Sequence, residues 1–241
     1  MTTADAPNDQ YNLSAPDSLA ARVAVRARRR MFDRFLAATG IRAEETVLDV
    51  GATSDQTYDG SNYLEAWYPH KGRITAAGLD DAAFLERLHP GLTFRRIEAG
   101  PLPFGDRSFD VVHSSAVLEH VGSARQQQDF LRELARVARR AVFVTTPNRW
   151  FPIEVHTQLP LLHWLPKQAF RRLLAGKRYG FFAREENLNL LGRGELRAMA
   201  RALPGWSAAI EPLRLLGWPS NLMLTLLRLP PSGRAGSIAP L

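Results

Sequence analysis

Five short apolar runs, separated by helical stretches, constrain the fold more than any other feature of this sequence. The runs are TVLDV (46–50), RITAAGL (73–79), LTFRRI (92–97), FDVVHSS (109–115) and AVFVTT (141–146). Between the last two, Phe130, Leu131, Leu134 and Val137 recur at helical spacing. Strands that alternate with helices of this size predict a parallel sheet covered on both faces, which binds its ligand beyond the carboxyl ends of its strands.

The segment before the first run predicts a long amphipathic helix at 17–39, ended by Gly40. Its basic face, around Arg26 to Arg30, is either solvated surface or a binding patch. The polar residues 1–16 predict a flexible arm, and 230–241 predict a loose tail. We therefore expect one domain, residues 17–229.

After Pro147 the alternation breaks into a stretch rich in proline and aromatic residues, at about 148–190. It begins where the last parallel strand would reach the ligand-binding edge, so it predicts a cap insertion, helical around Lys167–Leu174. The aromatic residues of this cap would line a substrate pocket or form its own small core. A helix at 192–203 and a strand at 206–217 follow, whereas 221–229 fits a strand or a helix.

Composition limits the classes of function. The 241 residues are 45% hydrophobic and 23% charged, which suits a globular domain with a sizeable core. The net charge is +7, but nearly all basic residues are arginines, a bias that gives little support for nucleic-acid binding. No cysteine is present, which excludes disulfides, thiolate metal sites and a cysteine nucleophile. The polar start lacks a signal-peptide core and predicts a cytoplasmic protein.

The turn VLDVGATSD (47–55) leads from the first strand into a glycine, as nucleotide-binding loops do. A dinucleotide loop needs three glycines to approach a pyrophosphate, but here the three places hold Gly51, Thr53 and Gln56. S-adenosylmethionine has no pyrophosphate, so one glycine suffices for it. Asp80 ends the second strand, where a carboxylate can accept from ribose hydroxyls, and Glu98 ends the third, where one can accept from an adenine amino group.

The stretch LPFGDRSFDVVHSSAVLEHV (102–121) resembles the signature of small-molecule class I S-adenosylmethionine-dependent methyltransferases. The resemblance covers about residues 41–150 and continues in TPNRWFP. It implies a doubly wound, mostly parallel, seven-stranded sheet and S-adenosylmethionine as cofactor. It also implies that the cofactor contacts Asp49, Gly51, Ala52, Thr53, Asp80, Glu98, Ala99, Ser114 and Ser115. Thr53 and Asp55 stand where the family usually has glycines, which leaves the path of this loop open.

Two histidines are the candidate catalytic residues. His120 follows the fourth strand and His156 lies in the cap, and a histidine near its ordinary pKa can accept a proton from the methyl acceptor. A backbone-bonded helix start is an equal alternative for His120. Some related enzymes bind a divalent metal with Glu-x-x-Glu-His and a distant histidine, but Ala116 replaces the first carboxylate here. We therefore expect no metal.

These features predict an enzyme that transfers a methyl group from S-adenosylmethionine to a small-molecule or lipid-like acceptor, with oxygen as the first choice of accepting atom. The alternatives are a catalytically inactive methyltransferase-like binding protein and a nicotinamide-dependent oxidoreductase. A nucleic-acid substrate is disfavoured, because HSSA stands where an Asn-Pro-Pro-Tyr-type motif would suit a flipped base. The basic helix and apolar cap favour an amphipathic or anionic acceptor and allow a peripheral membrane contact. The sequence leaves the oligomeric state open.

Overall fold

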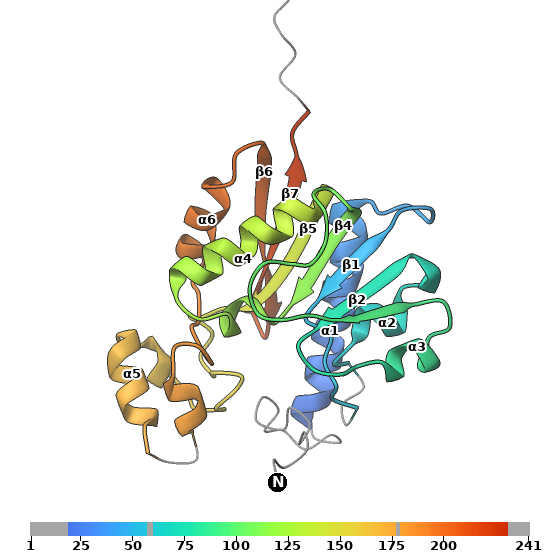
Figure 1. The fold of residues 1–241 in the computed structure, drawn as a ribbon. Coiled ribbons are helices and arrows are strands. Elements are labelled where there is room, and N and C mark those ends of the chain that lie inside the picture. Colours follow the sequence, from blue (N-terminus) through green and yellow to red (C-terminus); the bar gives the residue numbers. More distant parts are fainter. Residues whose placement is uncertain (1–18, 57–59, 177–178, 231–241) are drawn as a thin grey trace, which may run out of the picture.

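One mixed sheet of seven strands forms the framework of the chain (Figure 1). The computed structural model describes residues 19–56, 60–176 and 179–230, so the predicted arm and all but the first residue of the predicted tail lie outside the described residues. The helices are α1 (Leu19–Thr39), α2 (Tyr63–Trp67), α3 (Phe84–Leu88), α4 (Ala124–Val137), α5 (Lys167–Leu174) and α6 (Arg193–Arg201). The strands are β1 (Val47–Val50), β2 (Ile74–Gly78), β3 (Thr93–Arg96), β4 (Phe109–Ser115), β5 (Ala138–Pro147), β6 (Trp206–Leu215) and β7 (Trp218–Arg228).

The strand order is β3-β2-β1-β4-β5-β7-β6, and the first five strands are parallel. The segment 221–229, which fitted a strand or a helix, belongs to β7, and β7 runs antiparallel between β5 and β6. The chain moves outward from β1 in both directions, so the order reverses between β1 and β4. The predicted doubly wound sheet is confirmed, and its parallel strands end at one edge, which we call the carboxyl edge.

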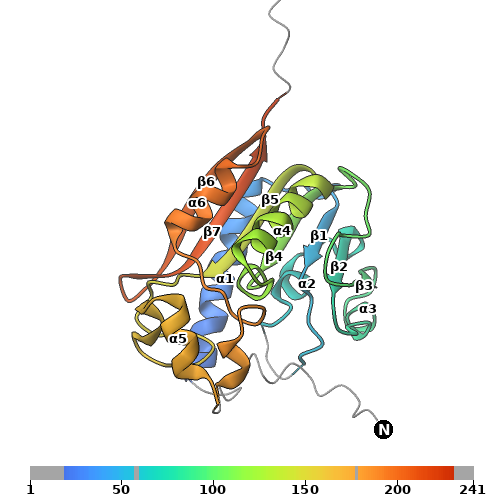
Figure 2. The same cartoon turned by 60° about the vertical axis from the view of Figure 1, so that its left-hand side comes forward.

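Alternating side chains of the central strands pack against helices on the two faces. Leu48 and Val50 of β1 face a core shared with α4 and α6. Val47 faces a second core, to which α1 contributes Met31 and Phe35. Figures 1 and 2 show α4 and α6 on one face and α1 on the other. This coverage explains why the central strands β1, β4 and β5 are buried on both faces, whereas the edge strand β3 is mostly exposed.

Helix α1 ends where the sequence predicted. The N–H of Gly40 donates to the carbonyl of Leu36 at 2.9 Å, and Gly40 adopts a left-handed φ of 54°. No helix in residues 19–56, 60–176 or 179–230 is long and apolar enough to cross a membrane.

The cap lies beyond the carboxyl edge (Figures 1 and 2). It contains α5 and the short 3-10 helices η4 (Leu162–Trp164) and η5 (Gly180–Ala183). Phe170, Leu174, Phe182, Leu188 and Leu190 form a small core within it. Of the two predicted uses of the cap aromatics, Phe182 thus serves the packing of the cap itself.

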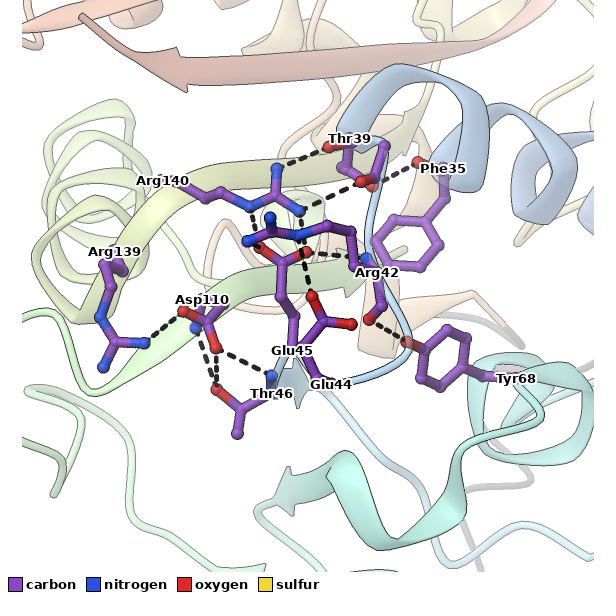
Figure 3. A network of polar contacts seen from close by, with 11 residues as sticks. Phe35, Thr39, Arg42, Glu44, Glu45, Thr46, Tyr68, Asp110, Arg139 and Arg140 are labelled. Carbon is purple, nitrogen blue, oxygen red and sulfur yellow. Dashed lines mark hydrogen bonds and ion pairs between the residues drawn. The ribbon is translucent and has the colours of Figure 1, made fainter. Parts of the chain in front are cut away.

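A network of arginines and carboxylates fastens α1 to the central strands at the opposite edge of the sheet (Figure 3). Glu45 is buried and accepts from both Nε and Nη2 of Arg140, with 2.6 Å from Nε, and from the backbone N–H of Arg42 at 2.8 Å. Arg140 also donates to the carbonyl of Thr39 at the end of α1. Burial disfavours the Glu45 charge, but these donors outweigh it and hold the pKa of Glu45 below its ordinary value.

We expect Arg140→Met to lower the free energy of unfolding by about 2 kcal/mol, because the buried Glu45 carboxylate loses two charged hydrogen bonds and keeps only Arg42 as a partner. Arg139→Met is the matched control: Arg139 is exposed, and its partner Asp110 also accepts from Thr46, so the expected loss is under about 1 kcal/mol. Urea unfolding at neutral pH measures both values. Equal losses would contradict the role assigned to the Arg140–Glu45 pair.

Candidate active site

The turn after β1 is held by the end of β2. The N–H groups of Gly51 and Ala52 both donate to the carbonyl of Ala77, at 2.8 and 3.0 Å. A Cβ on Gly78 would lie 2.1 Å from the Ala52 carbonyl oxygen, so this glycine is required for the turn to cross β2 closely. Because both amides are already bonded, the turn cannot offer them to a pyrophosphate, as a dinucleotide loop does.

Gly51 is required for a different reason. Its φ is +115°, and a Cβ there would lie 2.2 Å from Cγ2 of Val117, which follows β4. The glycine therefore allows the ends of β1 and β4 to approach at the point where the strand order reverses. Ligands bind at this point in open α/β sheets.

Hydrogen bonds to side chains fix the loop after Gly51, in which the family usually has two more glycines. The N–H of Thr53 donates to Oδ1 of Asn62 at 2.9 Å, and Nδ2 of Asn62 donates back to the carbonyl of Thr53 at 3.0 Å. Oγ of Ser61 donates to Oδ2 of Asp55 at 2.9 Å. The path that the sequence left open thus runs against the start of α2, where the side chains of Asn62 and Asp55 hold it.

Asp49 turns its carboxyl group toward the α1 side of the sheet. Its Oδ1 is 2.5 Å from Nδ1 of His113, and Nε2 of His113 is 2.9 Å from the Tyr63 hydroxyl. Burial raises the pKa of Asp49 to about 7 and lowers the pKa of His113 to about 4. The neighbouring Glu65 carboxyl is fully buried without a hydrogen-bond partner among the described residues, and burial raises its pKa further. Asp49 is therefore committed to this buried cluster through its side chain, and its predicted cofactor contact stays a prediction.

The predicted ribose and adenine residues lie together at the carboxyl edge. The N–H of Ile97 donates to the carbonyl of Gly78 at 2.9 Å, which places the ends of β2 and β3 side by side. Asp80 follows the first of these ends and is half-buried, whereas Glu98 and Ala99 follow the second and are exposed. Two carboxylates thus lie at neighbouring strand ends.

Ser114 and Ser115 differ in their surroundings. Ser114 is buried, and its Oγ donates to the carbonyl of Val50 at 2.8 Å, which ties β4 to β1. Ser115 is half-buried at the edge, with its Oγ 2.7 Å from Oγ1 of Thr145. Their predicted place beside the transferred methyl group remains a prediction, with Ser115 the better exposed of the two.

Residues 187–189, at the end of the cap, hydrogen-bond to the segment after β4. This segment contains the 3-10 helix η3 (Leu118–His120). Nδ1 of His120 is 2.6 Å from the carbonyl of Asn187, and the N–H of Asn189 donates to the carbonyl of Glu119 at 2.7 Å. The buried Gln127 of α4 links the same two segments, because it donates to the carbonyls of both Leu118 and Asn189. His120 is thus backbone-bonded, as one alternative predicted, but to the cap rather than to its own helix.

The second predicted histidine lies against the first. The rings of His120 and His156 have centroids 4.8 Å apart and are nearly perpendicular. Nδ1 of His156 is 2.7 Å from Oε1 of Glu154, whose carboxylate also accepts from the N–H groups of His156 and Thr157. The sequence analysis did not identify Glu154, although the signal was available: it is the acid two residues before the histidine in PIEVHT.

The two histidines have opposite electrostatic surroundings. Burial, together with the neighbouring His156, lowers the pKa of His120 to about 3, so His120 is neutral at neutral pH. Burial also disfavours a charge on His156, but the carboxylates of Glu154 and Glu119 outweigh it and raise its pKa. Glu154 shows the reciprocal effect, because His156 and the backbone donors overcome its burial and lower its pKa to about 2.

Glu119 is the third ionisable side chain next to His120 and His156. It is fully buried, and its Oε2 accepts from Oγ1 of Thr146 at 2.8 Å, whereas its Oε1 has no hydrogen-bond partner among the described residues. One ligand atom each of Glu119, His120 and His156 lies within 4.8 Å of the others, a spacing that suits a divalent cation. The prediction that the enzyme needs no metal stays a prediction.

Comparison with known proteins agrees with this geometry. Residues 60–144 match the family model of a methyltransferase domain. A comparison with curated proteins finds no match. The family match supports the predicted resemblance to the class I S-adenosylmethionine-dependent methyltransferases.

Several solved structures share the fold of this chain. The YcgJ protein from Bacillus subtilis has a TM-score of 0.55 and 16% identity, over 84% of this chain and 99% of that chain. Magnesium protoporphyrin IX methyltransferase (ChlM) from Synechocystis PCC 6803 with bound SAH has a TM-score of 0.55 and 16% identity, over 87% and 85%. A SAM-dependent methyltransferase from Aquifex aeolicus has a TM-score of 0.53 and 13% identity, over 87% and 97%.

The predicted cofactor, S-adenosylmethionine, is confirmed at the level of the domain. The carboxyl edge suits it chemically, because Asp80 and Glu98 are acceptors for hydroxyl and amino groups, and the amides of Gly51, Ala52 and Thr53 are bonded to other protein groups. Which side chains contact the cofactor stays a prediction.

We expect Asp80→Ala to weaken the binding of S-adenosylhomocysteine by about tenfold to a hundredfold, because a carboxylate that accepts from ribose hydroxyls is lost. Asp81→Ala is the matched control, since the exposed Asp81 caps the N–H of Ala83 instead. Isothermal titration calorimetry measures both dissociation constants, and circular dichroism confirms folding. Unchanged affinity in Asp80→Ala would show that the ribose lies elsewhere.

We expect Glu154→Gln to lower the pKa of His156, because only the Glu119 carboxylate then opposes the effect of burial. Titration of the imidazole resonances by NMR measures the shift. Glu185→Gln, in the same cap but paired with Arg171, should leave the pKa of His156 unchanged. A pKa of His156 that does not move in Glu154→Gln would refute the electrostatic coupling.

Proposed function

We propose that this methyltransferase transfers the methyl group of S-adenosylmethionine to a hydroxyl oxygen of a small-molecule or lipid-like acceptor. The proposal is based on one contact beside the carboxyl edge: His120, which follows β4, packs against His156 of the cap, which is bonded to Glu154. A base is needed there only if the acceptor loses a proton.

The chemistry explains this need. When bound, S-adenosylmethionine supplies a methyl group on a positively charged sulfur, and the leaving thioether requires no acid. A hydroxyl is a weak nucleophile until its proton is taken, so the protein has to align the acceptor and accept that proton. A buried histidine oriented by a carboxylate is an established solution to this problem.

His156 has the arrangement expected of the base. Glu154 accepts a hydrogen bond from its Nδ1, which leaves Nε2 as the atom that takes the proton. The carboxylate also stabilises the imidazolium that forms, since it raises the pKa of His156. Glu154 therefore acts as a positioning residue and His156 as the catalytic residue.

His120 complements this base. The Asn187 carbonyl can only accept, so Nδ1 of His120 carries the proton and Nε2 carries the lone pair. Because the imidazole is neutral at neutral pH, Nε2 can accept a hydrogen bond from the acceptor hydroxyl and hold it next to His156. The two histidines then divide the work of positioning and deprotonation.

A nicotinamide cofactor has less support from the same site. The amides of Gly51 and Ala52 are bonded to Ala77, so the site lacks the phosphate cradle that such a cofactor requires. Calorimetry with NAD and with S-adenosylhomocysteine distinguishes the two cofactors.

We expect His156→Asn to slow methyl transfer by about a hundredfold to ten-thousandfold while the affinity for S-adenosylhomocysteine stays unchanged. His163→Asn is the matched control, because His163 is another buried cap histidine, bonded to the Phe151 carbonyl outside the cluster. The assay follows methyl-labelled S-adenosylmethionine with a panel of small and lipid-borne alcohols. Equal rates in the two variants would contradict the assignment of the base.

The pH profile gives a second readout. A base must be unprotonated, so the rate should rise as pH increases through the pKa of His156, and Glu154→Gln should move this rise to lower pH. Label on carbon or nitrogen would contradict the choice of oxygen. Tight binding of S-adenosylhomocysteine without any labelled product would favour an inactive, methyltransferase-like binding protein.

A further inference from the structure

Large apolar side chains are exposed on the cap far more often than elsewhere. Of the thirteen exposed large hydrophobic residues in the described parts of the chain, seven lie between Trp150 and Leu173. Two more, Leu216 and Trp218, lie at the turn between β6 and β7. Clustered exposure of this kind marks an interaction surface, whereas scattered exposure does not.

Hydrogen bonds and ring contacts bring these residues onto neighbouring loops. Trp150 packs on Trp164 with centroids 6.3 Å apart, and the N–H of Leu161 donates to the carbonyl of Pro152 at 2.8 Å. The β6–β7 turn joins them, since Nδ2 of Asn148 donates to the carbonyl of Pro219 at 2.8 Å. We call the resulting surface the cap patch: Trp150, Ile153, Leu161, Leu162, Leu216 and Trp218.

Two leucines of the cap patch occupy backbone conformations that disfavour them. Leu161 has a φ of +61° and Leu216 a φ of +50°, in the left-handed region where glycine and asparagine are favoured. Leu216 is 94% exposed and precedes Gly217, also left-handed, in a turn where Asn-Gly is the preferred pair. Neither leucine is buried in the chain's own core, so neither is explained by folding.

The cap carries a net positive charge. From Arg149 to Glu186 the sequence has seven basic and three acidic residues, of which Glu154 is buried against His156 and Glu185 pairs with Arg171. Arg149 lies 5.1 Å above the ring of Trp150. Arg30 of α1 donates to the carbonyl of Arg214, so the basic face of that helix reaches the β6–β7 turn as well. The complementary surface is apolar and negatively charged.

We propose that the cap patch docks the methyltransferase on an anionic lipid bilayer, with its tryptophans and leucines in the interface and its arginines at the headgroups. Tryptophan and arginine suit that depth, and basic residues near a bilayer add attraction to anionic lipids. Docking does not require methyl transfer. Where the proposed function also holds, the cap would take its acceptor from the same lipid surface.

The test is co-sedimentation with phosphatidylglycerol-rich vesicles and with pure phosphatidylcholine vesicles, each with and without S-adenosylhomocysteine. Wild-type protein should bind the anionic vesicles, and high salt should weaken this binding. The double variant Leu161→Asn, Leu216→Asn should bind them about tenfold more weakly, because two apolar side chains leave the interface.

Failure to fold cannot explain such a loss, because asparagine is favoured at both positions and should leave the melting temperature equal or higher. Leu88→Gln is the matched control: Leu88 is 63% exposed on α3, at the opposite end of the sheet from the cap, and its loss should not affect binding.

Three outcomes would overturn the proposal. These are wild-type protein that stays unbound to anionic vesicles, a double variant that binds like wild type, and a wild-type dimer that the double variant dissociates in analytical ultracentrifugation. The last would assign the cap patch to a second copy of the chain. Vesicle binding by a protein that transfers no methyl group would support the docking while contradicting the proposed function.

Discussion

The carbonyl of Ala77 is the contact on which the rest of the site depends. It accepts the N–H groups of Gly51 and Ala52, and so pins the turn after β1 across the end of β2. Two glycines make this possible, Gly78 by admitting the Ala52 carbonyl and Gly51 by admitting Val117. This contact builds the crevice at the point where the strand order reverses. It also occupies the N–H groups of Gly51 and Ala52, so neither can bind a pyrophosphate, which favours a cofactor without phosphates.

The cluster of His120, His156 and Glu154 depends on a second long-range contact, between residues 187–189 of the cap and the segment after β4. Asn187 and Asn189 bond to His120 and Glu119, and thereby bring His156 against His120. A charge on either histidine is costly in this buried place, so the Glu154 carboxylate decides which of them carries it. In the mechanism we propose, this difference separates His156, the base, from His120, which positions the acceptor.

The cap therefore has two faces with different chemistry. Its inner side contributes His156 and Glu154 to the cluster, and its outer side exposes the cap patch among arginines. Leucines at left-handed positions are a cost to local stability, and clustered exposed apolar side chains are a cost to solubility. Both costs are explained if the outer side meets a lipid surface next to the active site.

The sequence by itself determined the alternation of strands and helices, the class of cofactor, and the edge at which Asp80 and Glu98 lie, because periodicity and strand ends are local properties. It also named His120 and His156. Tertiary structure alone decided that 221–229 is a strand between β5 and β6, that Asp49 faces His113 in a buried cluster, and that Glu154 orients His156. Each of these depends on which distant segment packs alongside, and burial sets pKa values that spacing along the chain cannot encode.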